Sequence, residues 1–119
     1  PSTDWNTLDF SDTSWFSGPG GFGYGDGDDG TVIDQTLSVY FRTDFSVPDI
    51  SKFYMAVLHA DYDDGFVAYI NGVEIFRSAN LGQSGTFVPF DETTSTDHEA
   101  QLYNGGIPEA YTLDSLELS

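Results

Sequence analysis

Hydrophobic and polar residues alternate along several short stretches of the chain, most clearly in residues 38–47. One face of this stretch is formed by alternate residues, with Thr43 as the exception: Val39, Phe41, Phe45 and Val47. A period of two predicts a β-strand with one buried face. Pro48 and Asp49 then end the strand.

In residues 53–62, apolar residues occupy both the odd and the even positions. This pattern is typical of a central strand buried on both faces. In residues 62–77, Asp63, Asp64 and Gly65 form a turn, residues 66–70 a strand, and residues 73–77 the returning strand. The two residues between these strands are Asn71 and Gly72, which both tolerate positive φ. They predict a type I′ hairpin turn.

The rest of the chain is less regular. Residues 5–16 place large apolar side chains among Asp, Ser and Thr, and seven of the fourteen residues in 18–31 are glycine. Long loops of this kind are usually functional or fastened to the body of a domain. Residues 86–90 could form a strand, 91–97 a polar loop and 103–108 a turn. Short strands, frequent turns and no helical periodicity predict one all-β domain over residues 1–119, an antiparallel sandwich or jelly roll.

Composition adds a strong charge. Twenty Asp and Glu oppose three basic residues, giving a net charge of −17, while ten Phe, seven Tyr and two Trp supply ample apolar surface for a core. The charge repels phosphate backbones and anionic lipids, so we expect no nucleic-acid partner. It fits either solubility in a salty extracellular medium or Ca²⁺ binding.

Several classes of feature are absent from the sequence. Without cysteine there is no disulfide or thiolate metal site. No apolar run is long enough to cross a bilayer, so we expect no membrane insertion. The chain begins at Pro1 without a signal peptide, and we expect it to be mature, trimmed or excised from a longer protein.

Two blocks, residues 5–27 (with FGYGDG) and 40–77 (with YDDGFVAYINGVEIFR), resemble the galactose-binding-like jelly-roll domains of large secreted bacterial multimodular proteins. Such domains occur beside CotH-kinase-like, lamin-tail, metallophosphoesterase or glycoside-hydrolase modules. The resemblance covers about residues 5–114. It implies a secreted or cell-surface β-sandwich, a structural Ca²⁺ site in many relatives, and binding by loops at one edge. It identifies no sugar, because one fold serves many functions.

Carboxylates in the glycine-rich loop are the first candidate metal site: Asp26, Asp28, Asp29 and Asp34. Carboxylates at near-alternate positions of a flexible loop can converge on one hard cation, although the EF-hand spacing is not met. The alternative is a solvated acidic turn.

A second candidate set is Asp61, Asp63 and Asp64, beside Asn71. So many close carboxylates repel one another unless Arg42, Arg77 or a cation balances them. The alternative, which we favour, is that these carboxylates bond nearby backbone N–H groups at a turn.

Sugar binding requires flat apolar rings flanked by hydrogen-bonding groups. The candidate rings lie in or beside predicted loops: Tyr24, Tyr62, Phe87 and Tyr103. The remaining large rings are more simply explained as core: Trp5, Trp15, Phe41, Phe53, Phe66 and Phe76.

No catalytic motif is present, so we expect no enzymatic activity. The two histidines, His59 and His98, cannot form a three-histidine site, and neither lies in an HExxH motif. Thr86 breaks the only approach to GxSxG, and no acidic pair is singled out as a glycosidase pair. We therefore predict a carbohydrate-binding or adhesion module. The alternative is a structural spacer or protein–protein assembly domain without glycan affinity.

The sandwich is expected to be incomplete at its C-terminus. Relatives of the resembled kind continue with further strands, whereas residues 111–118 supply at most one short strand. We expect an open groove or edge, completed by another segment of the same protein or by a strand from a neighbouring chain.

Overall fold

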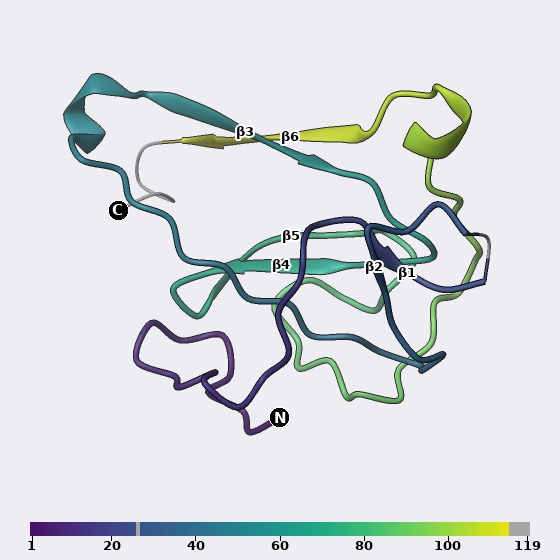
Figure 1. The fold of residues 1–119 in the computed structure, drawn as a ribbon. Coiled ribbons are helices and arrows are strands. Elements are labelled where there is room, and N and C mark those ends of the chain that lie inside the picture. The colour runs from purple at the N-terminus through teal and green to yellow at the C-terminus, as the bar shows by residue number, and fades with distance from the viewer. Residues whose placement is uncertain (26, 115–119) are drawn as a thin grey trace.

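The fold was obtained as a computed structural model, which describes residues 1–25 and 27–114 (Figure 1). Its strands, in order, are β1 (Phe22–Gly23), β2 (Thr31–Val32), β3 (Met55–Ala60), β4 (Val67–Ile70), β5 (Val73–Arg77) and β6 (Glu109–Asp114). Two single 3₁₀ turns, η1 (Ile50–Lys52) and η2 (Leu102–Asn104), are the helical elements among these residues. The architecture is therefore all-β, as the periodicity predicts.

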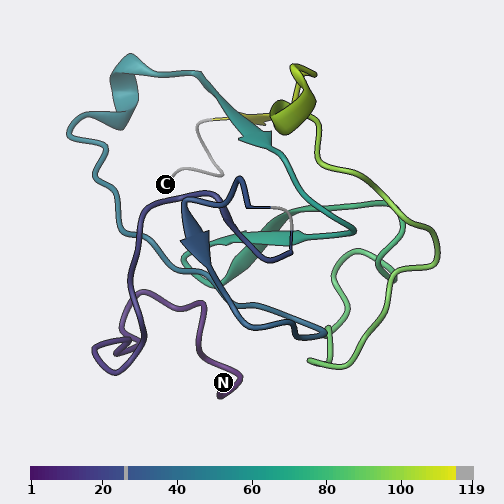
Figure 2. The same cartoon turned by 45° about the vertical axis from the view of Figure 1, so that its right-hand side comes forward.

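The strands of the described residues form three two-stranded sheets. β3 pairs with β6 and β4 with β5, both antiparallel, whereas β1 and β2 form a short parallel pair. The β3–β6 layer lies over the β4–β5 layer, and the two remain stacked when the molecule is turned (Figures 1 and 2). Tyr111 of β6 joins the layers, since its ring lies 4.6 Å from that of Phe76 and 5.6 Å from that of Phe66.

The predicted hairpin is confirmed. Asn71 and Gly72 adopt φ values of 48° and 82° between β4 and β5, as a type I′ turn requires. Arg77 then fastens the returning strand to the loop after it, because it pairs with Glu74 at 2.9 Å and donates to the carbonyl oxygens of Leu81 and Thr86. Its side chain is 2% exposed.

The glycine-rich loop folds back on itself. The Thr31 and Ile33 N–H groups donate to the carbonyl oxygens of Gly21 and Gly23, at 3.0 and 2.9 Å. A β-carbon at residue 30 would lie 2.4 Å from the carbonyl oxygen of Gly20, so this close crossing requires glycine.

The strand predicted over residues 38–47 is wrong. These residues have no strand partner, and they run back below the β4–β5 hairpin as an irregular extended segment (Figure 1). Arg42 sets their orientation. It pairs with Asp12 at 2.9 Å, donates to the carbonyl oxygens of Trp5 and Thr7 at 2.6 and 2.9 Å, and is 11% exposed. Tyr40 and Arg42 thus turn inward, whereas Asp44 on the same face is exposed.

Three further expectations are corrected. β3 has one neighbouring strand in the described part of the chain, and Met55 and Val57 are exposed, so it is not buried on both faces. Residues 86–90 form no strand. Phe41 and Phe53, expected in the core, are both exposed, although the Phe41 ring contacts that of Phe22.

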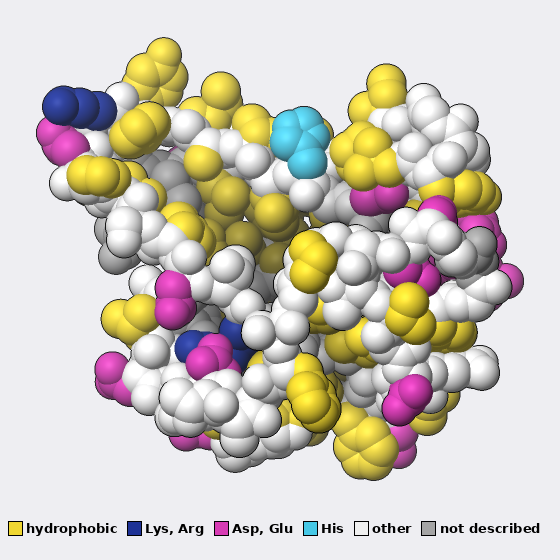
Figure 3. Space-filling model, in the orientation of Figure 1, with side chains coloured by type: hydrophobic (Ala, Val, Ile, Leu, Met, Phe, Trp, Pro, Cys, Tyr) yellow, Lys and Arg dark blue, Asp and Glu magenta, His cyan; other side chains and the backbone are white. Residues whose placement is uncertain are grey.

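The molecule exposes much apolar surface. Among the described residues, Leu81 and Leu113 are the only buried apolar side chains, and yellow side chains line a hollow beneath the β3–β6 layer (Figure 3). The accessible surface is 8780 Å², against about 6,300 Å² for a compact monomer of this mass. The radius of gyration is 15.1 Å, against about 13.5 Å. In the part of the chain that the structure describes, each strand pairs with a single neighbour.

Candidate functional site

A pocket of about 410 Å³ opens beside β6, where β3, β5 and the loop 95–98 come together. Its lining combines two tyrosine rings with a histidine, an arginine, carboxylates and small polar groups: Tyr62, Arg77, Ala79, Asn80, Ser95, Thr96, Asp97, His98, Glu109 and Tyr111. This volume falls within the usual range of small-molecule pockets.

Four side chains form the centre of the pocket. The His98 ring stacks on the Tyr62 ring with centroids 4.1 Å apart and an interplanar angle of 11°. Its Nδ1 lies 3.0 Å from the Tyr62 carbonyl oxygen and its Nε2 lies 3.1 Å from Glu109 Oε1. The Tyr111 hydroxyl donates to the other oxygen of Glu109. Glu109 therefore bonds to both the His98 ring and the Tyr111 hydroxyl.

These contacts shift the acidity of the groups involved. The hydrogen bond from Tyr111 lowers the pKa of Glu109, and the Tyr62 hydroxyl and His98 act in the same direction against partial burial. Burial, followed by the contact with Glu109, raises the pKa of both Tyr62 and Tyr111. At neutral pH the pocket thus contains an ionised carboxylate and two protonated phenols, which suits hydrogen bonding to hydroxyl groups.

Asn80 positions the loop that closes the pocket. The side-chain Nδ2 of Asn80 donates to the carbonyl oxygens of Asp64 and Thr96 at 2.8 and 2.7 Å. The backbone carbonyl oxygen of Asn80 accepts from the Ser95 N–H at 2.8 Å. Its Oδ1 is buried and accepts no hydrogen bond from the described residues. An unpaired buried acceptor is costly, so Oδ1 lowers the stability gained from the other hydrogen bonds of Asn80.

Asp61 and Asp64, from the second predicted metal set, bond backbone N–H groups. Asp61 accepts from Gln101 and Leu102 at 2.7 and 3.0 Å, and Asp64 accepts from His98 at 3.1 Å. Asp63 is largely exposed, but the slight burial of its carboxyl, followed by the charges of Asp64 and Glu99, raises its pKa. Neither arginine pairs with this set, because Arg42 pairs with Asp12 and Arg77 with Glu74.

The structure describes three carboxylates of the first predicted metal set. Asp26 lies outside the described residues, Asp28 is exposed, and Asp34 lines a different groove. Asp29 lies over Gly23, where its Oδ1 would be 2.1 Å from an added β-carbon, and its Oδ2 is buried without a hydrogen bond. Within residues 1–25 and 27–114, no three acidic or histidine side chains form a group that could hold a metal ion.

Of the four predicted sugar-binding rings, one lies in the pocket. Tyr62 lines it, whereas Tyr24, Phe87 and Tyr103 are exposed elsewhere and do not line it. The sequence analysis missed His98, Glu109, Tyr111 and Asn80 as site residues. The alternation of Glu109, Tyr111 and Leu113 along one strand face was an available signal, but nothing local indicated that His98 would meet that face.

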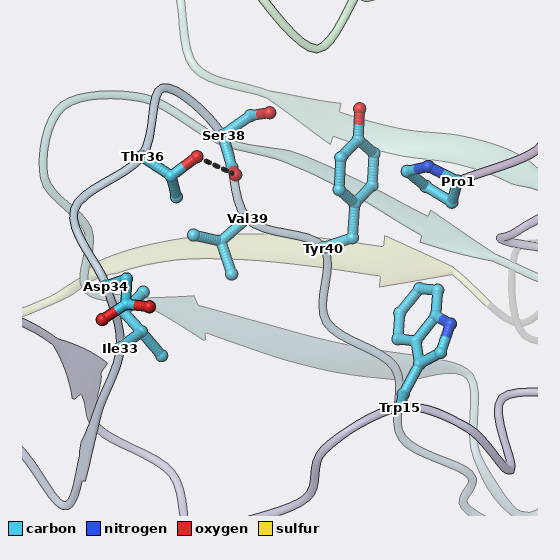
Figure 4. Close-up of a pocket in the computed structure, with 8 residues that line it drawn as sticks. All are labelled: Pro1, Trp15, Ile33, Asp34, Thr36, Ser38, Val39 and Tyr40. Carbon is cyan, nitrogen blue, oxygen red and sulfur yellow. Dashed lines mark hydrogen bonds between the residues drawn. The ribbon is translucent and has the colours of Figure 1, made fainter.

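A second groove, of about 400 Å³, runs along the residues after β2 (Figure 4). It is lined by Pro1, Trp15, Ile33, Asp34, Thr36, Ser38, Val39 and Tyr40. Tyr40 stands beside Pro1 and above Trp15, and the Thr36 hydroxyl donates to the Ser38 carbonyl oxygen at 3.4 Å. The groove also places hydrogen-bonding groups beside two rings, but its lining is more apolar than that of the pocket beside β6.

Comparison with known proteins gave no match to a family model, to a curated protein or to a solved structure. No helix in the described part of the chain is long and apolar enough to span a bilayer.

Proposed function

We propose that the chain is a non-catalytic carbohydrate-binding module, and that the pocket beside β6 binds the glycan. One observation supports this most: two tyrosine rings and an ionised carboxylate converge with hydroxyl, amide and imidazole groups in about 410 Å³. Flat rings with hydrogen-bonding groups at their edges are the chemistry that recognises sugar hydroxyls and C–H faces.

The proposal extends to the setting of the module. We propose a galactose-binding-like jelly roll in a secreted or cell-surface protein, where it tethers a larger assembly to a polysaccharide. The antiparallel layers β3–β6 and β4–β5 support the fold, and the net charge of −17 supports an extracellular medium. Ca²⁺ is proposed as a stabilising ion near Asp29, whose Oδ2 is buried without a hydrogen bond.

The test blocks the pocket without changing the fold. Thr96 is exposed and lines the pocket, so Thr96→Arg should fill the opening and remove glycan binding on an array. Thr93→Arg is the matched control, since Thr93 is exposed in the same loop and does not line the pocket. Equal binding by both variants would contradict the assignment. A loss confined to Tyr24→Ala or Tyr103→Ala would move the site to the exposed loop rings.

The glycan array and a thermal unfolding measurement are each run with Ca²⁺ and with EDTA at constant ionic strength. If a native-state calcium site supports the module, thermal unfolding shifts to a higher midpoint as free Ca²⁺ rises. The same midpoint under both conditions, in protein first stripped of metal, would remove Ca²⁺ from the proposal without touching the glycan pocket.

A further inference from the structure

Residues 38–47 combine two features that are rarely left together on a surface. Their alternate apolar side chains point outward, and Phe41 and Phe45 are 51% and 63% exposed. Their inward face is fixed by Arg42 and by Tyr40, whose ring meets that of Trp5 at 4.9 Å. The segment is thus held extended, with its apolar side uncovered.

The backbone of this segment is also unpaired. Among the described residues, no N–H or C=O group of residues 39–47 forms a hydrogen bond within the chain. An extended segment with open backbone groups and alternate apolar side chains is a template for strand addition. Phe22 continues the apolar surface, because its ring lies 4.6 Å from that of Phe41.

We propose that residues 38–47 dock a cationic β-strand of another polypeptide, which pairs with their backbone and covers their apolar face. The surface that such a strand would cover is formed by the exposed side chains of Val39, Phe41 and Phe45. This site is separate from the glycan pocket, so either proposal can fail alone.

Charge selects the kind of partner. The molecule carries −17 in all, and the cation within the segment, Arg42, is turned inward and paired. Asp34 and Asp44 are exposed on or beside the segment. A second copy would bring the same excess of negative charge to the interface, whereas a strand with alternate Lys or Arg is attracted to it.

The probe is a ten-residue peptide of alternating lysine and valine, titrated into the full chain while backbone amide exchange is followed by NMR. Binding should slow exchange in residues 38–47 and weaken as salt rises. The same peptide with N-methyl groups on alternate residues should bind at least tenfold more weakly, because it lacks the backbone donors. A glutamate–valine peptide should not bind.

The matched variants are Phe45→Ser and Phe90→Ser, whose rings are 63% and 67% exposed, so neither is expected to unfold the protein. Phe45→Ser should weaken binding by about tenfold or more, the cost of one lost aromatic contact, and Phe90→Ser should leave it unchanged.

Four results would overturn the proposal. The first is peptide binding without protection of residues 38–47, and the second is equal binding of the N-methylated peptide. The third is a dimer in analytical ultracentrifugation at physiological salt that Phe45→Ser abolishes, which would assign the face to a second copy. Absence of any binding by the lysine–valine peptide contradicts it as well.

Discussion

The β4–β5 hairpin and residues 38–47 are both predicted from the sequence to be strands, but their structures differ. Both are rich in β-forming apolar residues, and both contain one arginine. The hairpin pairs with itself through Asn71 and Gly72, and its arginine bonds to Glu74 three residues away. Residues 38–47 contain no such turn, and Arg42 bonds to groups thirty or more residues away.

This difference shows what a period of two specifies. It sets an extended backbone with two distinct faces, but it does not decide which face turns inward. In residues 38–47 the carbonyl oxygens of Trp5, Thr7 and Phe10 are the partners available to Arg42, and bonding them turns its side chain inward. The apolar face is exposed as a consequence.

The largest expected effect is in the hairpin. Arg77→Met removes a side chain that is 2% exposed and leaves Glu74, 16% exposed, without its ion pair. Loss of one partner of a buried pair costs about 3–5 kcal/mol, so the free energy of unfolding in urea should fall by that amount. Lys52→Met is the control, because the pair of Lys52 with Asp49 is exposed at 3.6 Å and should contribute below about 1 kcal/mol. Equal losses in the two variants would show that burial of the Arg77 pair is unimportant.

A smaller loss is expected in the second region. Arg42→Met breaks the pair with Asp12, which is 44% exposed and can be rehydrated, but it also leaves the carbonyl oxygens of Trp5 and Thr7 without their donor. We expect a loss of about 2–3 kcal/mol. Amide exchange should quicken in residues 5–12, while the hairpin amides keep their protection. Uniform quickening across both regions would mean that they unfold as one unit, and the comparison would not hold.

The structure of the hairpin could be predicted from the sequence, whereas that of residues 38–47 could not. The hairpin could be predicted because its determinants, the turn residues and the alternation, lie within sixteen residues. The inversion of residues 38–47 could not, because it depends on where the irregular residues 5–12 place their carbonyl oxygens.

The candidate site shows the same limit. Tyr62 could be selected as a ring beside a predicted turn, and the bonding of Asp61 and Asp64 to backbone N–H groups follows the alternative favoured from the sequence. His98 could not be selected, because its neighbours in the chain are polar loop residues. Its role appears only when Tyr62 and Glu109 are brought to it from two strand ends.

The smallest expected effect concerns Asp63, at the turn that opens the hairpin. Burial, then the charges of Asp64 and Glu99, raise its pKa, so the folded state holds this proton more tightly than the unfolded chain does. Folding is therefore favoured while Asp63 is protonated, and that contribution is lost as pH rises from the carboxyl's ordinary pKa through its raised folded value. Asp63→Asn, which stays neutral, should raise the melting temperature slightly at pH 7 and leave it unchanged at pH 3.

Asp44→Asn is the matched control for Asp63→Asn, because Asp44 is an exposed carboxyl in residues 38–47 and its replacement removes the same single negative charge. A general relief of repulsion in a chain of net charge −17 would raise the melting temperature of both variants equally at pH 7. A larger rise for Asp63→Asn assigns the effect to the crowded carboxyls at the hairpin turn. Equal rises would show that the hairpin, like residues 38–47, responds only to the overall charge.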